Sequence, residues 1–122
     1  MKTAIAILLS LAASGAFAAP MTGKSASGEV LTGENGMTLY TFAKDAAGVS
    51  NCAGDCAVKW PPFVATEEDE EAAKAPFSVI ERSDGTYQWA LKGMPLYFWA
   101  GDKAAGDTTG DGVGGVWSVA RP

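Results

Sequence analysis

Two cysteines, Cys52 and Cys56, carry the most reactive side chains in this sequence of 122 residues. An even, closely spaced pair in an oxidising compartment predicts first of all a disulfide. A redox-active dithiol is one alternative, although such motifs usually space their cysteines as C-x-x-C. Copper(I), held by the cysteines together with Met37 or Met94, is another, because thiolate and thioether ligands suit that ion. We expect the disulfide.

A ten-residue phrase that ends in a carboxylate occurs twice, as GMTLYTFAKD at 36–45 and as GMPLYFWAGD at 93–102. Its aromatic rings and its aspartate could line a small groove, since such a surface suits sugars or cationic ligands. The structural interpretation, which we prefer, makes the aspartate an acceptor for backbone N–H groups of the loop that follows the strand. Both interpretations concern the same side chains, which are Tyr40, Phe42, Asp45, Tyr97, Trp99 and Asp102.

The Gly-rich loop GDTTGDGVGG carries two acidic residues at the spacing of calcium ligands. Asp107 and Asp111 match the first and fifth positions of a calcium-binding loop. Thr109 and Ser118 stand where further acidic ligands are usual, so only two carboxylates remain. We therefore keep Asp107 and Asp111 as weak metal candidates and expect a plain turn.

Histidine is missing from the chain, which excludes several kinds of catalytic site. Ser-His pairs, Cys-His pairs and His-based zinc sites all need that residue. Two carboxylates could in principle hydrolyse a glycosidic bond, but nothing in the sequence marks such a pair. We expect no enzyme activity and no cofactor.

A shift of 57 residues superposes the two phrases by taking Gly36 to Gly93, and the same shift takes Trp60 to Trp117 without a gap. A period near this length predicts a supersecondary unit that cannot bury its apolar face alone. We therefore expect an all-β fold of two hairpin-based repeats packed about a pseudo-twofold axis, with Gly-rich loops and one short disulfide. The expected parts are repeat one at about 28–63, an acidic connector at about 64–76 and repeat two at about 77–120.

Short β-rich runs between turn residues predict the strands of each repeat. Within the first phrase, Met37 and Leu39 face one side of the strand while Tyr40 and Phe42 face the other, so both faces are apolar. The acidic stretch at 67–73 predicts a solvated helical turn or loop. The expected strands lie at 28–32, 38–43, 77–82, 87–91, 95–99 and 116–120.

Residues 1–18 predict a Sec signal peptide, because a positive start is followed by an apolar run too short to span a bilayer. Cleavage is expected after Ala18, with Ala19 as an alternative, and no cysteine near the cut offers a site for a lipid. Residues 19–122 are then expected to form one periplasmic or secreted domain, as a monomer without a transmembrane segment. The formal net charge of −5 argues against nucleic acid and anionic lipid as partners.

Taken together, these residues resemble a family of bacterial secreted repeats named for a Yx(FWY)xxD motif, many of whose members are predicted lipoproteins. The motif maps onto Tyr40, Phe42 and Asp45 in the first repeat and onto Tyr97, Trp99 and Asp102 in the second. The pattern also covers Cys52, Cys56, Trp60, Pro61 and Pro62. This chain departs from the family in lacking the lipobox cysteine, so the resemblance implies secretion without implying a membrane anchor or a biochemical activity.

Three classes of function remain. We expect a non-catalytic binding or interaction module of the cell envelope, whose partner is an envelope protein or a small ligand. A redox or metal accessory protein, with copper or calcium as the metal, is the alternative suggested by the cysteine pair and the repeated methionine. An enzyme is the third.

Overall fold

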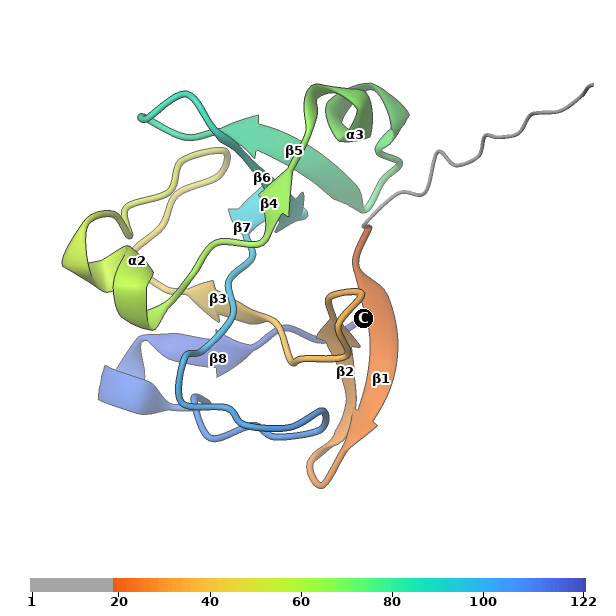
Figure 1. Ribbon diagram of the computed structural model, residues 1–122, viewed down its shortest axis with the longest axis vertical. Helices are drawn as coiled ribbons and strands as arrows, with labels where there is room; N and C mark the ends of the chain where they lie inside the picture. The colour runs from red at the N-terminus through yellow and green to blue at the C-terminus, as the bar shows by residue number, and fades with distance from the viewer. Residues whose placement is uncertain (1–18) are drawn as a thin grey trace, which may run out of the picture.

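Short strands dominate the computed structural model, which describes residues 19–122, and the expected signal peptide lies outside these residues (Figure 1). The strands are β1 (Met21–Ser25), β2 (Gly28–Thr32), β3 (Tyr40–Phe42), β4 (Val64–Ala65), β5 (Phe77–Glu81), β6 (Tyr87–Leu91), β7 (Met94–Pro95) and β8 (Trp117–Val119). The helical segments are α2 (Asp55–Lys59), α3 (Glu67–Ala72) and the 3₁₀ turn η2 (Val113–Gly115).

Most of the predicted strands form. Strands β2 and β6 have the predicted bounds, and β3, β5 and β8 lie within longer predicted ranges. The predicted strand at 95–99 keeps regular pairing only at Met94–Pro95 and continues through an isolated bridge at Tyr97. Strands β1 and β4 and helix α2 are additions that the sequence did not predict.

The acidic connector forms a short helix, as the sequence allowed. Thr66 precedes α3 and accepts a hydrogen bond from the Asp69 N–H, while the Asp69 carboxylate accepts one from the Thr66 N–H. This reciprocal capping box satisfies two of the free N–H groups at the start of a helix. It also explains why Asp69 is buried while its acidic neighbours point into solvent.

Each repeat begins with an antiparallel hairpin, β1–β2 in the first and β5–β6 in the second. Strand β6 also pairs with β4 and β7, so the second hairpin belongs to a sheet of order β4-β6-β5 with β7 alongside. Strand β3 pairs with β8 at the opposite end of the chain. The repeats are therefore related hairpin units, but their pairing crosses from one repeat to the other.

The last segment of each repeat pairs with the phrase of the other repeat. In one half, Phe42 lies opposite Trp117, and the Ala43 N–H donates to the Val116 carbonyl at 2.7 Å. In the other half, the Ala100 N–H donates to the Lys59 carbonyl at 2.9 Å. Ala100 is 57 positions from Ala43, and Lys59 is 57 positions from Val116. The two repeats are therefore interlocked, because the phrase of each repeat pairs with the last segment of the other.

The pseudo-twofold axis passes between two tyrosines. The Tyr40 N–H donates to the Tyr97 carbonyl at 2.8 Å, and the Tyr97 N–H donates back to the Tyr40 carbonyl at 3.0 Å. Such a reciprocal pair is the hydrogen-bonded pair of an antiparallel ladder. Each phrase therefore has hydrogen-bonded neighbours on both edges, which are the phrase of the other repeat on one edge and the last segment of that repeat on the other.

Three backbone hydrogen bonds close a ring beside this axis, and the ring occurs twice. In one ring Leu31 donates to Ala120, Ala120 donates to Leu39, and Leu39 donates to Leu31. The other ring joins Trp89, Phe63 and Leu96 in the same cyclic order, with N···O distances of 2.9 to 3.0 Å. The rings identify Trp89 as the structural counterpart of Leu31.

That match corrects one detail of the sequence comparison, because the shift from Leu31 to Trp89 is 58 residues and not 57. The first hairpin turns through two residues between Ser25 and Gly28, whereas the second turns through three between Arg82 and Thr86. The extra residue is recovered at the next turn, where only Lys92 and Gly93 separate β6 from β7. Both have positive φ, as a two-residue hairpin turn requires.

Two apolar cores lie on opposite faces of the phrases. Tyr40 and Tyr97 belong to one core together with Trp60 and Trp117. Their neighbours Leu39 and Leu96 belong to the other, which also holds Phe63 and Trp89. The alternation predicted for a strand that is apolar on both faces is confirmed. No helix within residues 19–122 has the length and apolar character needed to cross a bilayer.

The exchange of strands predicts that neither repeat folds by itself. A fragment of residues 19–74 lacks β8 as the partner of β3, and a fragment of residues 75–122 lacks β4 as the partner of β6. We expect each fragment alone to show the narrow amide dispersion of an unfolded chain in NMR spectra, and an equimolar mixture to recover the spectrum of the intact domain. Dispersed signals and a cooperative melt from either fragment alone would contradict the interlocked arrangement.

Candidate functional site

The tyrosine of each phrase donates its hydroxyl hydrogen bond to the aspartate of the other phrase. Tyr40 Oη lies 2.7 Å from Asp102 Oδ2, and Tyr97 Oη lies 2.7 Å from Asp45 Oδ2. Both tyrosines have no exposed surface and Asp102 is buried, while Asp45 is half-buried. The two copies of the phrase therefore satisfy each other's buried polar groups across the pseudo-twofold axis.

The second oxygen of each carboxylate holds the loop that follows its phrase. Asp102 Oδ1 accepts from the backbone N–H of Thr109 at 3.0 Å and from its hydroxyl at 2.7 Å. Asp45 Oδ1 accepts from the backbone N–H of Asn51 at 2.6 Å. Loop contacts of this kind are what the structural interpretation of the phrase predicted, and a ligand-binding role for these residues stays a prediction.

Burial controls the protonation of these pairs. It is the largest cause that raises the pKa of Tyr40 and of Tyr97, and the adjacent carboxylates raise both further. Burial also raises the pKa of Asp45, against hydrogen bonds from Asn51 and Tyr97 and the positive charge of Arg82. At neutral pH the tyrosines are consequently fixed donors and are poorly suited to act as general bases.

Four aromatic rings form a continuous stack on the same face of the phrases. Trp60 and Trp117 stand at its centre, with ring centroids 3.8 Å apart and an interplanar angle of 2°. Phe42 covers Trp117 at 4.2 Å and Trp99 covers Trp60 at 4.2 Å, so the stack has the symmetry of the fold. Phe42 and the tryptophans therefore pack against one another, and only Trp99 keeps appreciable exposure.

The Gly-rich loop covers this stack closely. A Cβ atom at Gly110 would lie 2.8 Å from the Trp60 ring and 3.0 Å from Tyr40 Cζ, so no larger residue fits. The Gly110 N–H also donates to Tyr40 Oη at 3.2 Å. This packing gives the loop a structural role over the aromatic stack.

The weak calcium candidates are engaged with the backbone. Asp107 Oδ2 accepts from the N–H groups of Lys103 and Ala104 at 2.8 and 3.0 Å, and these bonds lower its pKa. Asp111 Oδ1 accepts from the Val119 N–H at 3.1 Å. Within residues 19–122, no group of three or more acidic, histidine or cysteine side chains is placed to hold a metal ion.

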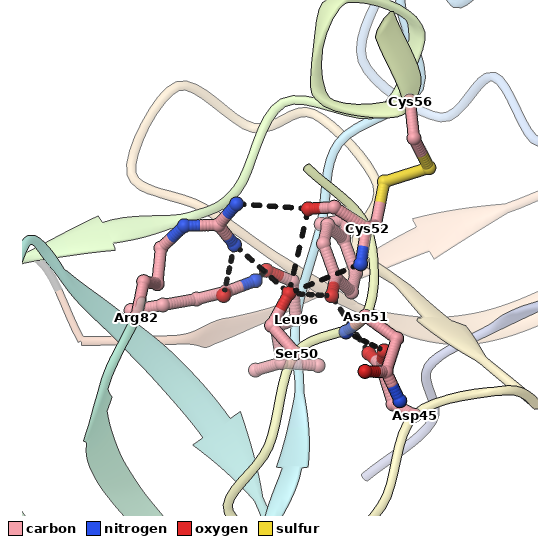
Figure 2. Close-up of a disulfide and its surroundings, with 9 residues drawn as sticks. Asp45, Ser50, Asn51, Cys52, Cys56, Arg82 and Leu96 are labelled. Carbon is pink, nitrogen blue, oxygen red and sulfur yellow. Dashed lines mark hydrogen bonds between the residues drawn. A yellow bond between two sulfur atoms is a disulfide. The ribbon is translucent and has the colours of Figure 1, made fainter. Parts of the chain in front are cut away.

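The predicted disulfide between Cys52 and Cys56 is confirmed, with an S–S distance of 2.06 Å. Figure 2 shows Arg82, a buried arginine that is hydrogen-bonded to the backbone carbonyl of Cys52. Arg82 Nη2 donates to the Cys52 carbonyl at 2.8 Å, and Nη1 donates to Ser50 Oγ at 3.0 Å and to Gln88 Oε1 at 2.7 Å. Ser50 Oγ lies 2.6 Å from Tyr97 Oη, which joins this network to the phrase.

The sequence does not predict this network. It predicts Arg82 only as the end of a strand, and it predicts no role for Ser50 or Gln88. A polar residue within an apolar strand, as Gln88 is in YQWAL, is the available signal for a buried hydrogen-bond partner. Ser50 and Cys52 lie 32 and 30 residues from Arg82 in the sequence, so their contacts with it leave no local pattern.

An open apolar pocket with a volume of about 330 Å³ lies beside the second core, and no residue of the phrases lines it. Trp89 forms part of its wall and is 2% exposed. The Trp89 indole Nε1 is buried and finds no hydrogen-bond partner within residues 19–122. A buried donor left unpaired costs about 1–3 kcal/mol, so this site is less well satisfied than the phrase. The lining residues are Ala19, Ala72, Ala73, Lys74, Phe77 and Trp89.

The exchanged Tyr–Asp pairs predict a large effect of a single carboxylate on stability. Replacing Asp102 by Ala leaves the Tyr40 hydroxyl and the Thr109 N–H without their acceptor, so we expect the free energy of unfolding to fall by about 1–3 kcal/mol. Urea denaturation measures this loss. The matched control is Asp55→Ala at an exposed position, expected to change stability by no more than about 0.5 kcal/mol. Equal stability of the two variants would contradict a structural role for Asp102.

The raised tyrosine pKa values predict a loss of stability in alkali. The unfolded chain releases each tyrosine proton near pH 10, whereas the folded chain holds it to higher pH, so stability is full below about pH 10 and falls as the pH rises. Each tyrosine contributes a slope of at most about 1.4 kcal/mol per pH unit. We expect the double variant Tyr40→Phe, Tyr97→Phe to lose stability less steeply between pH 10 and 12 in urea denaturation. Parallel pH profiles would show that neither hydroxyl is bound as described.

Comparison with known proteins agrees with the internal repeat. No curated protein and no solved structure gives a significant match. A family model described as a secreted repeat of unknown function matches twice, at residues 21–64 and 78–121. These ranges are 57 residues apart and together cover most of the chain, and each begins with the first strand of a hairpin. The chain therefore belongs to this family of secreted repeats of unknown function.

Proposed function

We propose that the chain is a non-catalytic binding module of the bacterial cell envelope, exported to the periplasm or beyond after cleavage of a signal peptide at Ala18. Membership in a family of secreted repeats supports export. The leader sequence and its A-F-A site are the sequence features that favour this cleavage point.

The observation that carries the binding role is the apolar pocket at Trp89. A pocket of about 330 Å³ falls at the lower end of small-molecule sites, which are mostly apolar with a few fixed polar groups. Its apolar wall includes Phe77 and Trp89, and the unpaired indole N–H is a polar group able to orient a ligand.

The residues that could perform other chemistry are occupied within the fold. Tyr40 is hydrogen-bonded to Asp102, and Tyr97 is hydrogen-bonded to Asp45. The two cysteines form a disulfide. A group that acts as nucleophile or base needs a free lone pair near an accessible reacting atom. The internal bonding of these groups supports a module that binds without catalysis.

A redox accessory function is the second candidate. Cys56 is half-buried at the start of α2, whereas Cys52 is fully buried and held through its carbonyl by Arg82. A thiolate from a partner could therefore reach only the Cys56 sulfur. A copper(I) role with Met37 or Met94 would first require reduction of this bond.

Native mass spectrometry of the protein isolated from the periplasm tests the proposal. We expect a chain that begins at Ala19 without covalent lipid, with the disulfide intact, and with an additional non-covalent mass that is lost on denaturation. The matched control is Ala73→Leu, which places a larger side chain in the pocket wall and should abolish the additional mass.

Three outcomes would contradict the proposal. A lipid-modified chain would place the protein on a membrane by a route that the sequence does not suggest. Two free thiols after isolation under alkylating conditions would favour the redox candidate. A chain of the expected mass with no bound molecule from any growth condition would remove the support for a binding role.

A further inference from the structure

The Trp89 indole N–H is the one buried side-chain polar group for which residues 19–122 supply no hydrogen-bond partner. Buried polar side chains are satisfied in the large majority of cases, so an unsatisfied donor calls for a partner that the chain does not supply. Trp89 also lines the open pocket, where such a partner could enter.

The other repeat shows that the fold itself does not require a tryptophan here. Leu31 occupies the equivalent place, donates the equivalent backbone hydrogen bond and is 1% exposed in the same core. A leucine packs there without any polar atom to satisfy. The indole of Trp89 therefore adds a donor at a position where the architecture needs only an apolar side chain.

The walls of the pocket indicate what can reach this donor. Phe77 and the alanines at 19, 72 and 73 offer apolar surface. The volume of about 330 Å³ corresponds to roughly ten atoms of the size of a water oxygen. A ligand must therefore be small and mainly apolar, with one group that accepts a hydrogen bond.

The charges around the pocket favour an acceptor over a cation. Lys74 is exposed at the rim, and in a chain cleaved after Ala18 the amino group of Ala19 is a second positive charge in the lining. Helix α3, which ends at Ala72 in the pocket wall, carries its four acidic residues in its first turn. A neutral carbonyl and a carboxylate can therefore both accept from the indole, whereas a cation would meet two like charges.

We propose that this pocket binds a small acyl or aromatic compound whose carbonyl oxygen, in an amide, ester or carboxylate, accepts the Trp89 Nε1 hydrogen bond. This inference rests on the proposed binding function and names the class of ligand. The carbonyl oxygen satisfies the buried donor, and the hydrocarbon part covers Phe77 and the alanines.

Three probes with the same eight-carbon chain separate the contributions. Octanamide has a neutral acceptor and ten non-hydrogen atoms, octanoate has an anionic acceptor, and octylammonium has donors only. The chain holds four tryptophans, so a ¹⁵N spectrum shows up to four indole N–H signals, and the signal that disappears in Trp89→Leu belongs to Trp89.

We expect octanamide to shift the Trp89 signal saturably and to bind about tenfold or more tightly than octylammonium, since only octanamide satisfies the donor. In Trp89→Leu, which carries the residue of the other repeat, this preference should vanish. Ala73→Leu keeps the indole but fills the pocket, so octanamide should no longer shift the Trp89 signal. This second variant tests the site even if Trp89→Leu fails to fold.

Two results would overturn the inference. These are a Trp89 signal unmoved by octanamide up to its solubility limit, or equal or tighter binding of octylammonium. Octanoate also carries an acceptor and is expected to shift the same signal. If the exported protein carries a bound molecule while octanamide leaves Trp89 unmoved, the ligand class is wrong and the binding function stands. If octanamide binds at Trp89 while the exported protein carries nothing, the binding function fails and the chemistry of the pocket stands.

Discussion

The reciprocal backbone pair between Tyr40 and Tyr97 is the constraint on which the rest of the structure depends. It places the two phrases side by side at the pseudo-twofold axis, with β8 on the outer edge of one and residues 60–62 on the outer edge of the other. A strand in that position has no edge in water and lies between two cores. Both of its faces must then be apolar, which is why the phrase does not alternate between apolar and polar residues.

The tyrosines and aspartates follow from the same constraint. A tyrosine fills the core beside the tryptophans, but its hydroxyl needs a buried acceptor. The symmetry supplies one, because the aspartate at the end of each phrase lies beside the tyrosine of the other. Each aspartate then uses its remaining oxygen to hold the loop that follows it, and the loop held by Asp102 covers the aromatic stack. The motif is therefore a set of contacts made between repeats, which explains why a single copy would not suffice.

Repetition made much of the fold predictable from the sequence. The period identified the two units, and strong β-formers between turn residues located β2, β5 and β6. Strand β1 was missed because MTGKS has few β-branched or aromatic residues and gains its place only by pairing with β2. The exchange of strands between the repeats could not be predicted either. Trp60 and Trp117 are the same residue type, so the segment around each could pair within its own repeat. Choosing between these pairings depends on distances through space that no local pattern records.

Differences between the repeats are more informative about function than their agreement. Residues that both copies share, such as the tyrosines and the stacked tryptophans, are explained by packing at the axis. Gln88, where the first repeat has Val30, is also explained, because it bonds both Arg82 and the Leu96 carbonyl. Trp89, where the first repeat has Leu31, is not explained in this way, since its indole N–H finds no acceptor in the part of the chain that the structure describes. The two differences are adjacent on one strand and face opposite cores, and one is satisfied internally while the other lies beside an open pocket. This asymmetry, which costs stability, is the observation from which we propose a molecule that completes it.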